Sequence, residues 1–183
     1  MTPATDIHLG KILIVDDESA NVLLLQMMLR RAGYLDVTAT LDSSKVCELH
    51  RANHYDLILL DLQMPGLDGF EVMEFLKGIE AGGYLPVLVI AAQASHKLRA
   101  LNAGARDFIS KPFELAEVLV RVHNMLEVRL MHRAVRAYSQ ALESLARRDP
   151  LTGLANRRLA LEKMQIAVAN GRTRCISWRS GQR

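Results

Sequence analysis

The chain has few cysteines, few aromatic residues and no long hydrophobic run. Of its 183 residues, 5% are aromatic. The longest apolar run, at 87–92, has six residues, whereas a transmembrane helix needs about 20. The only two cysteines, Cys47 and Cys175, form neither a metal-binding spacing nor a disulfide framework, which favours a reducing compartment. No cationic segment feeds an apolar one near the N-terminus. We therefore expect a cytoplasmic protein that makes no membrane contact.

The net charge of +3 combines two parts of opposite sign. Residues 1–127 carry a net charge of −6, and residues 128–183 carry a net charge of +9. A difference of this size predicts two segments with different roles. Half of the residues are hydrophobic, which is enough for a full core in the first segment.

Short apolar runs alternate with helical patterns throughout the first segment. The five runs lie at 11–15, 35–39, 56–60, 86–92 and 107–110. Strands that alternate with helices predict an α/β fold with a parallel sheet. Right-handed crossovers then place helices on both faces of the sheet. In such sheets, ligands bind at the carboxyl ends of the strands.

Charged side chains directly follow three of these runs. Asp16 and Asp17 follow the first, Asp61 follows the third, and Lys111 follows the fifth. In a sheet of order 2-1-3-4-5, the first and third strands are neighbours, so these groups converge. Each pair of carboxylates at ~4 Å costs roughly 4 kcal/mol at an effective dielectric of 20. Mg²⁺ relieves this repulsion, and a carboxylate can also attack phosphorus to form an aspartyl phosphate.

Three motifs together resemble the receiver domain of two-component response regulators. They are ILIVDDE at 12–18, LILLDLQMPGLDGFE at 57–71 and LNAGARDFISKPF at 101–113. The resemblance implies a flavodoxin-like (CheY-like) fold with strand order 2-1-3-4-5. It also implies a Mg²⁺-dependent phosphorelay in which Asp61 accepts the phosphoryl group from a histidine kinase.

The same resemblance implies roles for further residues. Asp17, Asp61 and the backbone carbonyl of Gln63 would hold Mg²⁺, with Asp16 helping through a water molecule. Lys111 would contact the phosphoryl oxygens, and Phe108 would be the aromatic switch residue that moves inward on activation. The peptide bond that precedes Pro112 would be cis.

The fourth apolar run departs from the pattern of this family. It reads VLVIAAQAS, so Ala91 stands where the family usually has Thr or Ser. A hydrogen bond from a hydroxyl to a charged phosphoryl group is worth roughly 1.5–3 kcal/mol, and two-state switches have gaps of only a few kcal/mol. We therefore expect phosphorylation of Asp61 to be retained and the conformational response to be weakened.

The helical pattern continues beyond the expected end of the receiver at residue 127. Apolar residues follow one another with spacings of 3, 4, 3, 4 and 3, namely Val128, Met131, Val135, Tyr138, Leu142 and Leu145. This heptad seam predicts either a stalk that pairs with a second copy in parallel or a long amphipathic helix that packs on its own domain. We divide the chain into a tail at 1–10, a receiver at 11–127, a helical stalk at 128–148 and a final segment at 149–183.

The final segment begins with DPLTGLANRR at 149–158, which resembles the opening of the GGDEF domain of diguanylate cyclases. Complete relatives make cyclic di-GMP from GTP. The Gly-Gly-acid signature is missing here, because the only Gly-Gly pair lies at 82–83 and Glu162 is the last acid. We therefore expect a GGDEF segment shortened by truncation or by a frameshift near Arg172, and no cyclase activity.

Three functions follow from these observations. The first is a non-enzymatic response regulator that signals through protein contacts. The alternative is a response-regulator diguanylate cyclase whose catalytic part is missing here. The second alternative is a DNA-binding regulator, in which basic residues near 147–158 would neutralise phosphates. No interleaved aromatic residues and no helix-turn-helix pattern support binding to nucleic acid.

Overall fold

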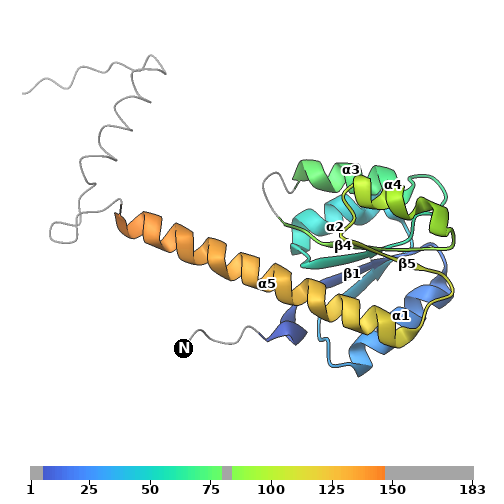
Figure 1. Ribbon diagram of the computed structural model, residues 1–183, viewed down its shortest axis with the longest axis horizontal. Helices are drawn as coiled ribbons and strands as arrows, with labels where there is room; N and C mark the ends of the chain where they lie inside the picture. The colour runs from blue at the N-terminus through green and yellow to red at the C-terminus, as the bar shows by residue number, and fades with distance from the viewer. Residues whose placement is uncertain (1–5, 80–83, 147–183) are drawn as a thin grey trace, which may run out of the picture. The chain divides into compact units, whose positions relative to one another are not determined.

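The computed structural model describes residues 6–79 and 84–146. Its sheet has five parallel strands in the order β2-β1-β3-β4-β5, which confirms the predicted α/β fold and strand order. Figure 1 shows the sheet with its covering helices. The strands are β1 (Ile12–Val15), β2 (Val37–Thr40), β3 (Leu57–Leu60), β4 (Val87–Ala91) and β5 (Asp107–Ser110). The α-helices are α1 (Ser19–Arg31), α2 (Val46–Asn53), α3 (Gly69–Ile79), α4 (Lys97–Asn102) and α5 (Leu115–Ala146).

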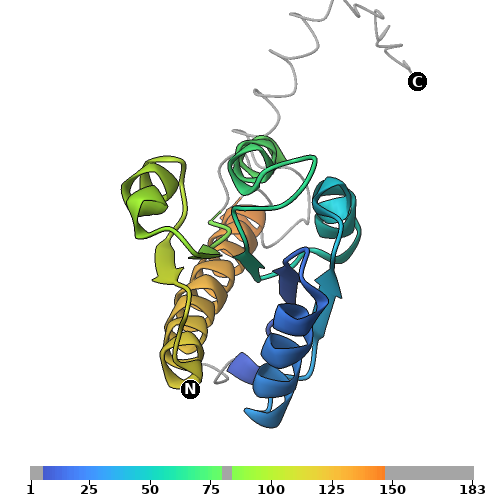
Figure 2. The same cartoon turned by 90° about the vertical axis from the view of Figure 1, so that its right-hand side faces the viewer.

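Helices cover both faces of the sheet (Figure 2). Two apolar layers hold them there, one on each face. Alternate side chains of β1 point into different layers, with Ile12 and Ile14 in one and Leu13 and Val15 in the other. The first layer includes buried side chains of α1 and α5, and the second includes buried side chains of α2, α3 and α4. Both faces are therefore covered, which is why the strands consist almost entirely of apolar residues.

The second strand begins two residues later than the apolar pattern predicts. β2 starts at Val37, whereas the predicted strand covered 35–39. Leu35 is 73% exposed, and its backbone N–H donates to the carbonyl of His8 in a short 3₁₀ turn (Ile7–Leu9). The N–H of Leu35 thus bonds to His8 and not to a neighbouring strand. Pairing of β2 with β1 therefore starts at Val37.

The chain divides into two compact units, Met1–Ala134 and Val135–Arg183. The first unit contains the sheet and its covering helices, and α5 continues without interruption through the predicted receiver boundary at 127. In the second unit, the described side chains from Val135 to Leu142 are exposed. The predicted GGDEF segment at 149–183 lies outside the described residues. Among the helices of the described chain, none is long and apolar enough to cross a membrane.

Candidate functional site

An acidic pocket lies at the carboxyl ends of β1 and β3. Val15 pairs with Leu60 in the register of these strands, and the backbone N–H of Asp61 donates to the carbonyl of Val15 at 2.9 Å. Asp16 and Asp61 therefore follow neighbouring strand ends, and both are buried, with 3% and 7% of their surface exposed. Asp17 is exposed, and carboxylate oxygens of the three aspartates lie within 4.8 Å of one another.

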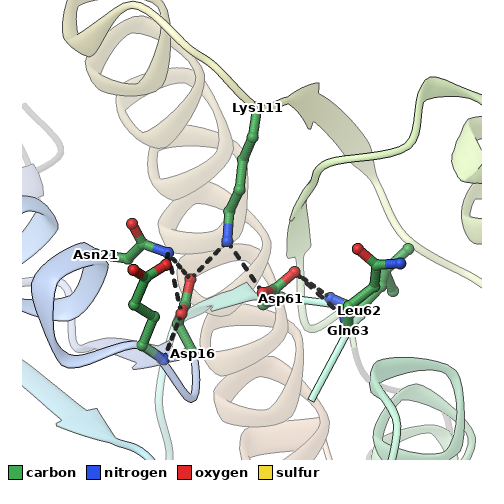
Figure 3. Close-up of polar contacts among 7 residues, drawn as sticks. Asp16, Asn21, Asp61, Leu62, Gln63 and Lys111 are labelled. Atoms are coloured by element: carbon green, nitrogen blue, oxygen red, sulfur yellow. Dashed lines mark hydrogen bonds and ion pairs between the residues drawn. The ribbon is translucent and has the colours of Figure 1, made fainter.

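Lys111 brings a positive charge to this pocket from the end of β5 (Figure 3). Its Nζ donates to Asp16 Oδ2 at 2.9 Å and to Asp61 Oδ2 at 3.0 Å. Burial lowers the pKa of Lys111, but the hydrogen bonds and negative charges of the two aspartates outweigh this effect and raise the pKa above the usual lysine value. Lys111 is therefore protonated at neutral pH, and it neutralises part of the acidic cluster.

The backbone of the following loop orients the Asp61 carboxylate. Its Oδ1 accepts hydrogen bonds from the N–H groups of Leu62 at 2.7 Å and Gln63 at 3.4 Å (Figure 3). One oxygen of Asp61 is thus held by the backbone and the other by Lys111. Such charge-assisted bonds are strong and fix the orientation of the carboxylate.

Asn21 belongs to this site, although the sequence motifs did not indicate it. Its Nδ2 donates to both oxygens of Asp16, at 3.2 and 3.0 Å, and to Glu18 Oε2 at 3.0 Å (Figure 3). The N–H of Glu18 also donates to Asp16 Oδ1 at 2.9 Å. The sequence did contain one clue to this contact. Asn21 lies in the first turn of the helix, five residues after Asp16, and from that position its short side chain reaches back to the end of the preceding strand.

Gly69 lies in the motif at 57–71, but the sequence did not reveal its steric role, which is to let α3 approach the loop after β3 closely. A Cβ at this position would lie 2.5 Å from the carbonyl oxygen of Asp61 and 2.8 Å from the Cα of Leu62. Its N–H donates to the carbonyl of Leu62 at 3.2 Å. Only glycine permits this contact, which places the start of α3 directly against the backbone that carries Asp61.

Comparison with known proteins identifies the family of the domain that carries this pocket. The family described as the response regulator receiver domain matches residues 12–123, which is more than half of the chain. The chain belongs to the response regulator receiver family. Residues 12–123 therefore form a receiver domain of the two-component response regulator type, and this domain contains the acidic pocket and Lys111.

Individual relatives agree with this assignment. The chain is 39% identical over 118 residues to the DNA-binding dual master transcriptional regulator RpaA of Synechocystis, an alignment that covers 63% of this chain and 48% of that protein. It is 35% identical over 124 residues to the response regulator PleD of Caulobacter vibrioides, covering 67% of this chain and 27% of that protein. The chain thus spans about half or less of the length of these curated relatives.

Solved structures show the same receiver fold. A response regulator from Chloroflexus aurantiacus superposes with a TM-score of 0.61 at 32% sequence identity. The match covers 64% of this chain and 98% of that chain. The shared region therefore corresponds to almost the whole of that chain, while the remainder of this chain lies outside the match.

The receiver lacks a hydroxyl at the end of β4. Ala91 is fully buried, and its carbonyl accepts a hydrogen bond from the backbone N–H of Lys111 at 2.9 Å. Phe108 on β5 is also buried, at 4% exposure, in the same apolar layer as Ala91. The Lys111–Pro112 peptide bond is cis. The aromatic side chain of Phe108 is thus inside the domain, and Ala91 offers no side-chain donor to the pocket.

The pocket of the receiver has the donor set of a site for a hard divalent cation. Its three carboxylates provide oxygen ligands, and exposed Asp17 lies on the solvent side of buried Asp16 and Asp61. Mg²⁺ binds through a few carboxylates and keeps several of its waters, so it needs a site that is partly open. The residues present therefore fit a magnesium ion.

Proposed function

We propose that Asp61 accepts a phosphoryl group from a histidine kinase and that this reaction requires Mg²⁺. The observation that carries the proposal is the arrangement of the Asp61 carboxylate, with Oδ1 bound to two backbone N–H groups and Oδ2 bound to Lys111. A carboxylate held in one orientation at the open end of a sheet is suited to attack phosphorus, because positioning contributes much of the rate of such transfers.

In this reaction an oxygen of Asp61 forms a bond to phosphorus, and the bond between phosphorus and the histidine nitrogen of the kinase breaks. The electron pair of the broken bond returns to the imidazole, which leaves as a neutral ring once protonated. Lys111, now bound to Asp61 Oδ2, would shift its contact to the phosphoryl oxygens and balance their charge. Asn21 would keep Asp16 in place throughout.

Asp17, Asp61 and the backbone carbonyl of Gln63 would hold Mg²⁺ in this proposal, with Asp16 acting through a water molecule. The ion would supply positive charge to the phosphoryl oxygens during transfer. The support in this chain is the clustering of three aspartates, because three carboxylates at short range repel one another and a bound divalent cation would offset this repulsion.

The test is phosphorylation of the full chain by acetyl phosphate with Mg²⁺, followed by intact mass measurement. We expect one labile phosphoryl adduct that is absent in Asp61→Asn. Asp68→Asn is the matched control, since this aspartate lies in the same loop and instead accepts a hydrogen bond from the N–H of Glu71 at 2.9 Å. An adduct that persists in Asp61→Asn would refute the assignment of Asp61.

We further propose that the receiver signals through a homodimer of α5 helices. Five apolar residues of the predicted seam are 40–68% exposed, namely Val128, Met131, Val135, Tyr138 and Leu142. The side chain of Leu145 lies outside what the structure describes. Heptad-spaced apolar side chains that stay exposed on a 32-residue helix favour a seam that pairs with a second copy. The test is to compare the oligomeric state of Met131→Glu with that of wild type by light scattering.

The GGDEF segment supplies a second candidate function. The motif at 149–158 supports a relation to diguanylate cyclases, while the missing signature supports a chain that makes no cyclic di-GMP by itself. Incubation with GTP and Mg²⁺, followed by mass detection of cyclic di-GMP, distinguishes the two functions. The DNA-binding activity that the name of RpaA states belongs to a protein of which the alignment covers only 48%.

A further inference from the structure

A buried carboxylate lies at the opposite end of β3 from the phosphorylation site. Asp56 directly precedes β3, five residues before Asp61, and is 1% exposed. It takes no part in the chemistry proposed above. A carboxylate removed from water in this way must be paired with positive charge and hydrogen-bond donors. Its partners therefore indicate what it does.

Asp56 binds two arginines of α5 and the backbone of β1. Its Oδ1 accepts from Arg133 Nη1 at 2.6 Å and from Arg129 Nε at 3.4 Å, and its Oδ2 accepts from the N–H of Lys11 at 3.2 Å. Arg129 also donates through Nη1 to the carbonyl of Tyr84, which precedes β4. One carboxylate thus connects α5 with the amino ends of the neighbouring strands.

These contacts lie on the face of α5 that is turned toward the sheet. Leu126, Arg129 and Leu130 are at most 8% exposed, whereas Val128 is 40% and Met131 is 63% exposed. Successive residues of a helix are 100° apart, so the arginines and the seam residues occupy different faces. Any rotation of α5 that moved the seam inward would also remove the arginines from Asp56.

An ionic contact restricts rotation of the helix more strongly than an apolar one. The hydrophobic effect is non-directional, so it does not by itself select one rotational position of the helix. The planar guanidinium of arginine binds carboxylates in a narrow set of geometries. Moreover, rotation would leave Asp56 buried without its charge partners, which is strongly unfavourable.

We propose that Asp56, Arg129 and Arg133 form an ionic clamp that fixes the rotational position of α5 and so determines the face that Val128 and Met131 offer to a second copy. The clamp itself is a property of the single receiver, while its consequence for pairing rests on the α5 homodimer proposed above. Asp56 is thus a positioning residue for assembly, at the far end of the strand that carries the phosphoryl acceptor.

Amide hydrogen exchange of the full chain tests the clamp without reference to the dimer. We expect Asp56→Asn and the milder Arg133→Gln to accelerate exchange in residues 126–134. Asp107→Asn is the matched control, because Asp107 also pairs with an arginine of α5, Arg121, but one that lies earlier in the helix. Each variant that still forms the phosphoryl adduct at Asp61 with acetyl phosphate is shown to be folded. Unchanged exchange in both folded clamp variants would overturn the proposal.

Disulfide cross-linking tests the consequence for pairing. In a full chain with Cys47→Ser and Cys175→Ser, we expect Val128→Cys to cross-link and the neighbouring Glu127→Cys to cross-link much less. Addition of Asp56→Asn should abolish this preference. A preference that survives in Asp56→Asn would overturn the role of the clamp in presenting the seam. Cross-linking at neither position would instead refute the dimer, and hydrogen exchange would still decide whether the clamp exists.

Discussion

The carbonyl of Ala91 accepts a hydrogen bond from the backbone N–H of Lys111 at 2.9 Å, so the end of β4 directly supports the residue that carries the positive charge of the pocket. The side chain of Ala91 contributes nothing polar to this junction. The receiver therefore retains the position of Lys111 but has no hydroxyl through which β4 could respond to a phosphoryl group.

Ala91→Thr should widen the structural difference between the phosphorylated and free forms. The new hydroxyl can donate to a phosphoryl oxygen, a bond worth roughly 1.5–3 kcal/mol. We would measure amide hydrogen exchange of α4 and β5 with and without beryllofluoride. Ala91→Val is the matched control, because valine has the shape of threonine without the hydroxyl. An equal response in the Thr and Val variants would contradict this role of the hydroxyl.

Lys111 should add a pH-dependent contribution to stability. Its pKa is raised in the folded protein, so the folded state holds this proton more tightly than the unfolded chain does. The contribution is present in full below the unfolded pKa of about 10.4 and is lost as the pH rises through the raised folded pKa. We expect the free energy of unfolding in urea to fall more steeply above pH ~10 for wild type than for Lys111→Met.

Tyr34 also makes the stability depend on pH in the alkaline range, but it does so equally in wild type and in Lys111→Met. Burial raises the pKa of Tyr34, so stability also falls when this tyrosine ionises in the unfolded chain. Tyr34 is present in both proteins, and the difference between the two curves therefore reports Lys111. Parallel curves for wild type and Lys111→Met would show that the salt bridges of Lys111 do not stabilise the folded state.

Gly69→Ala should destabilise the receiver and slow phosphorylation of Asp61. The added Cβ would lie 2.5 Å from the carbonyl oxygen of Asp61, so the loop or α3 must move. Such overpacking costs about 1–3 kcal/mol. Gly78→Ala in the same helix is the control, because nothing lies within 4 Å of its Cβ, and it should be neutral or stabilising by about 0.5–1 kcal/mol. Urea unfolding and adduct formation would be measured for both.

Mg²⁺ should stabilise the wild-type protein against urea at neutral pH. Binding at a concentration about 100 times the dissociation constant adds about 2.7 kcal/mol. Asp17→Asn should lose most of this gain, since Asp17 is the exposed member of the acidic cluster. Glu48→Gln, which removes an exposed acid on α2, should keep it. Equal gains in the two variants would show that Mg²⁺ acts elsewhere on the protein.

The apolar runs were sufficient to predict the strands, and the motifs shared with receiver domains supplied their order and, with it, the meeting of Asp16, Asp61 and Lys111. The reason is that buried parallel strands are continuous apolar runs and that their carboxyl ends share one edge of the sheet. The start of β2 was less predictable, because the contact between Leu35 and His8 depends on a 3₁₀ turn far away in the sequence.

Only the tertiary structure revealed the partners of Asp56, the close approach at Gly69 and the bonds from Asn21 to Asp16. Asp56 and Arg133 are 77 residues apart, and no local pattern marks one as the partner of the other. The sequence by itself determined the composition of each strand end and the spacing of the seam on α5. The packing of α5 on the sheet decided which side of that helix is buried. The contacts of its arginines with Asp56 were also decided by the tertiary structure, because contacts between residues far apart in the chain depend on the folded arrangement and have no local signature.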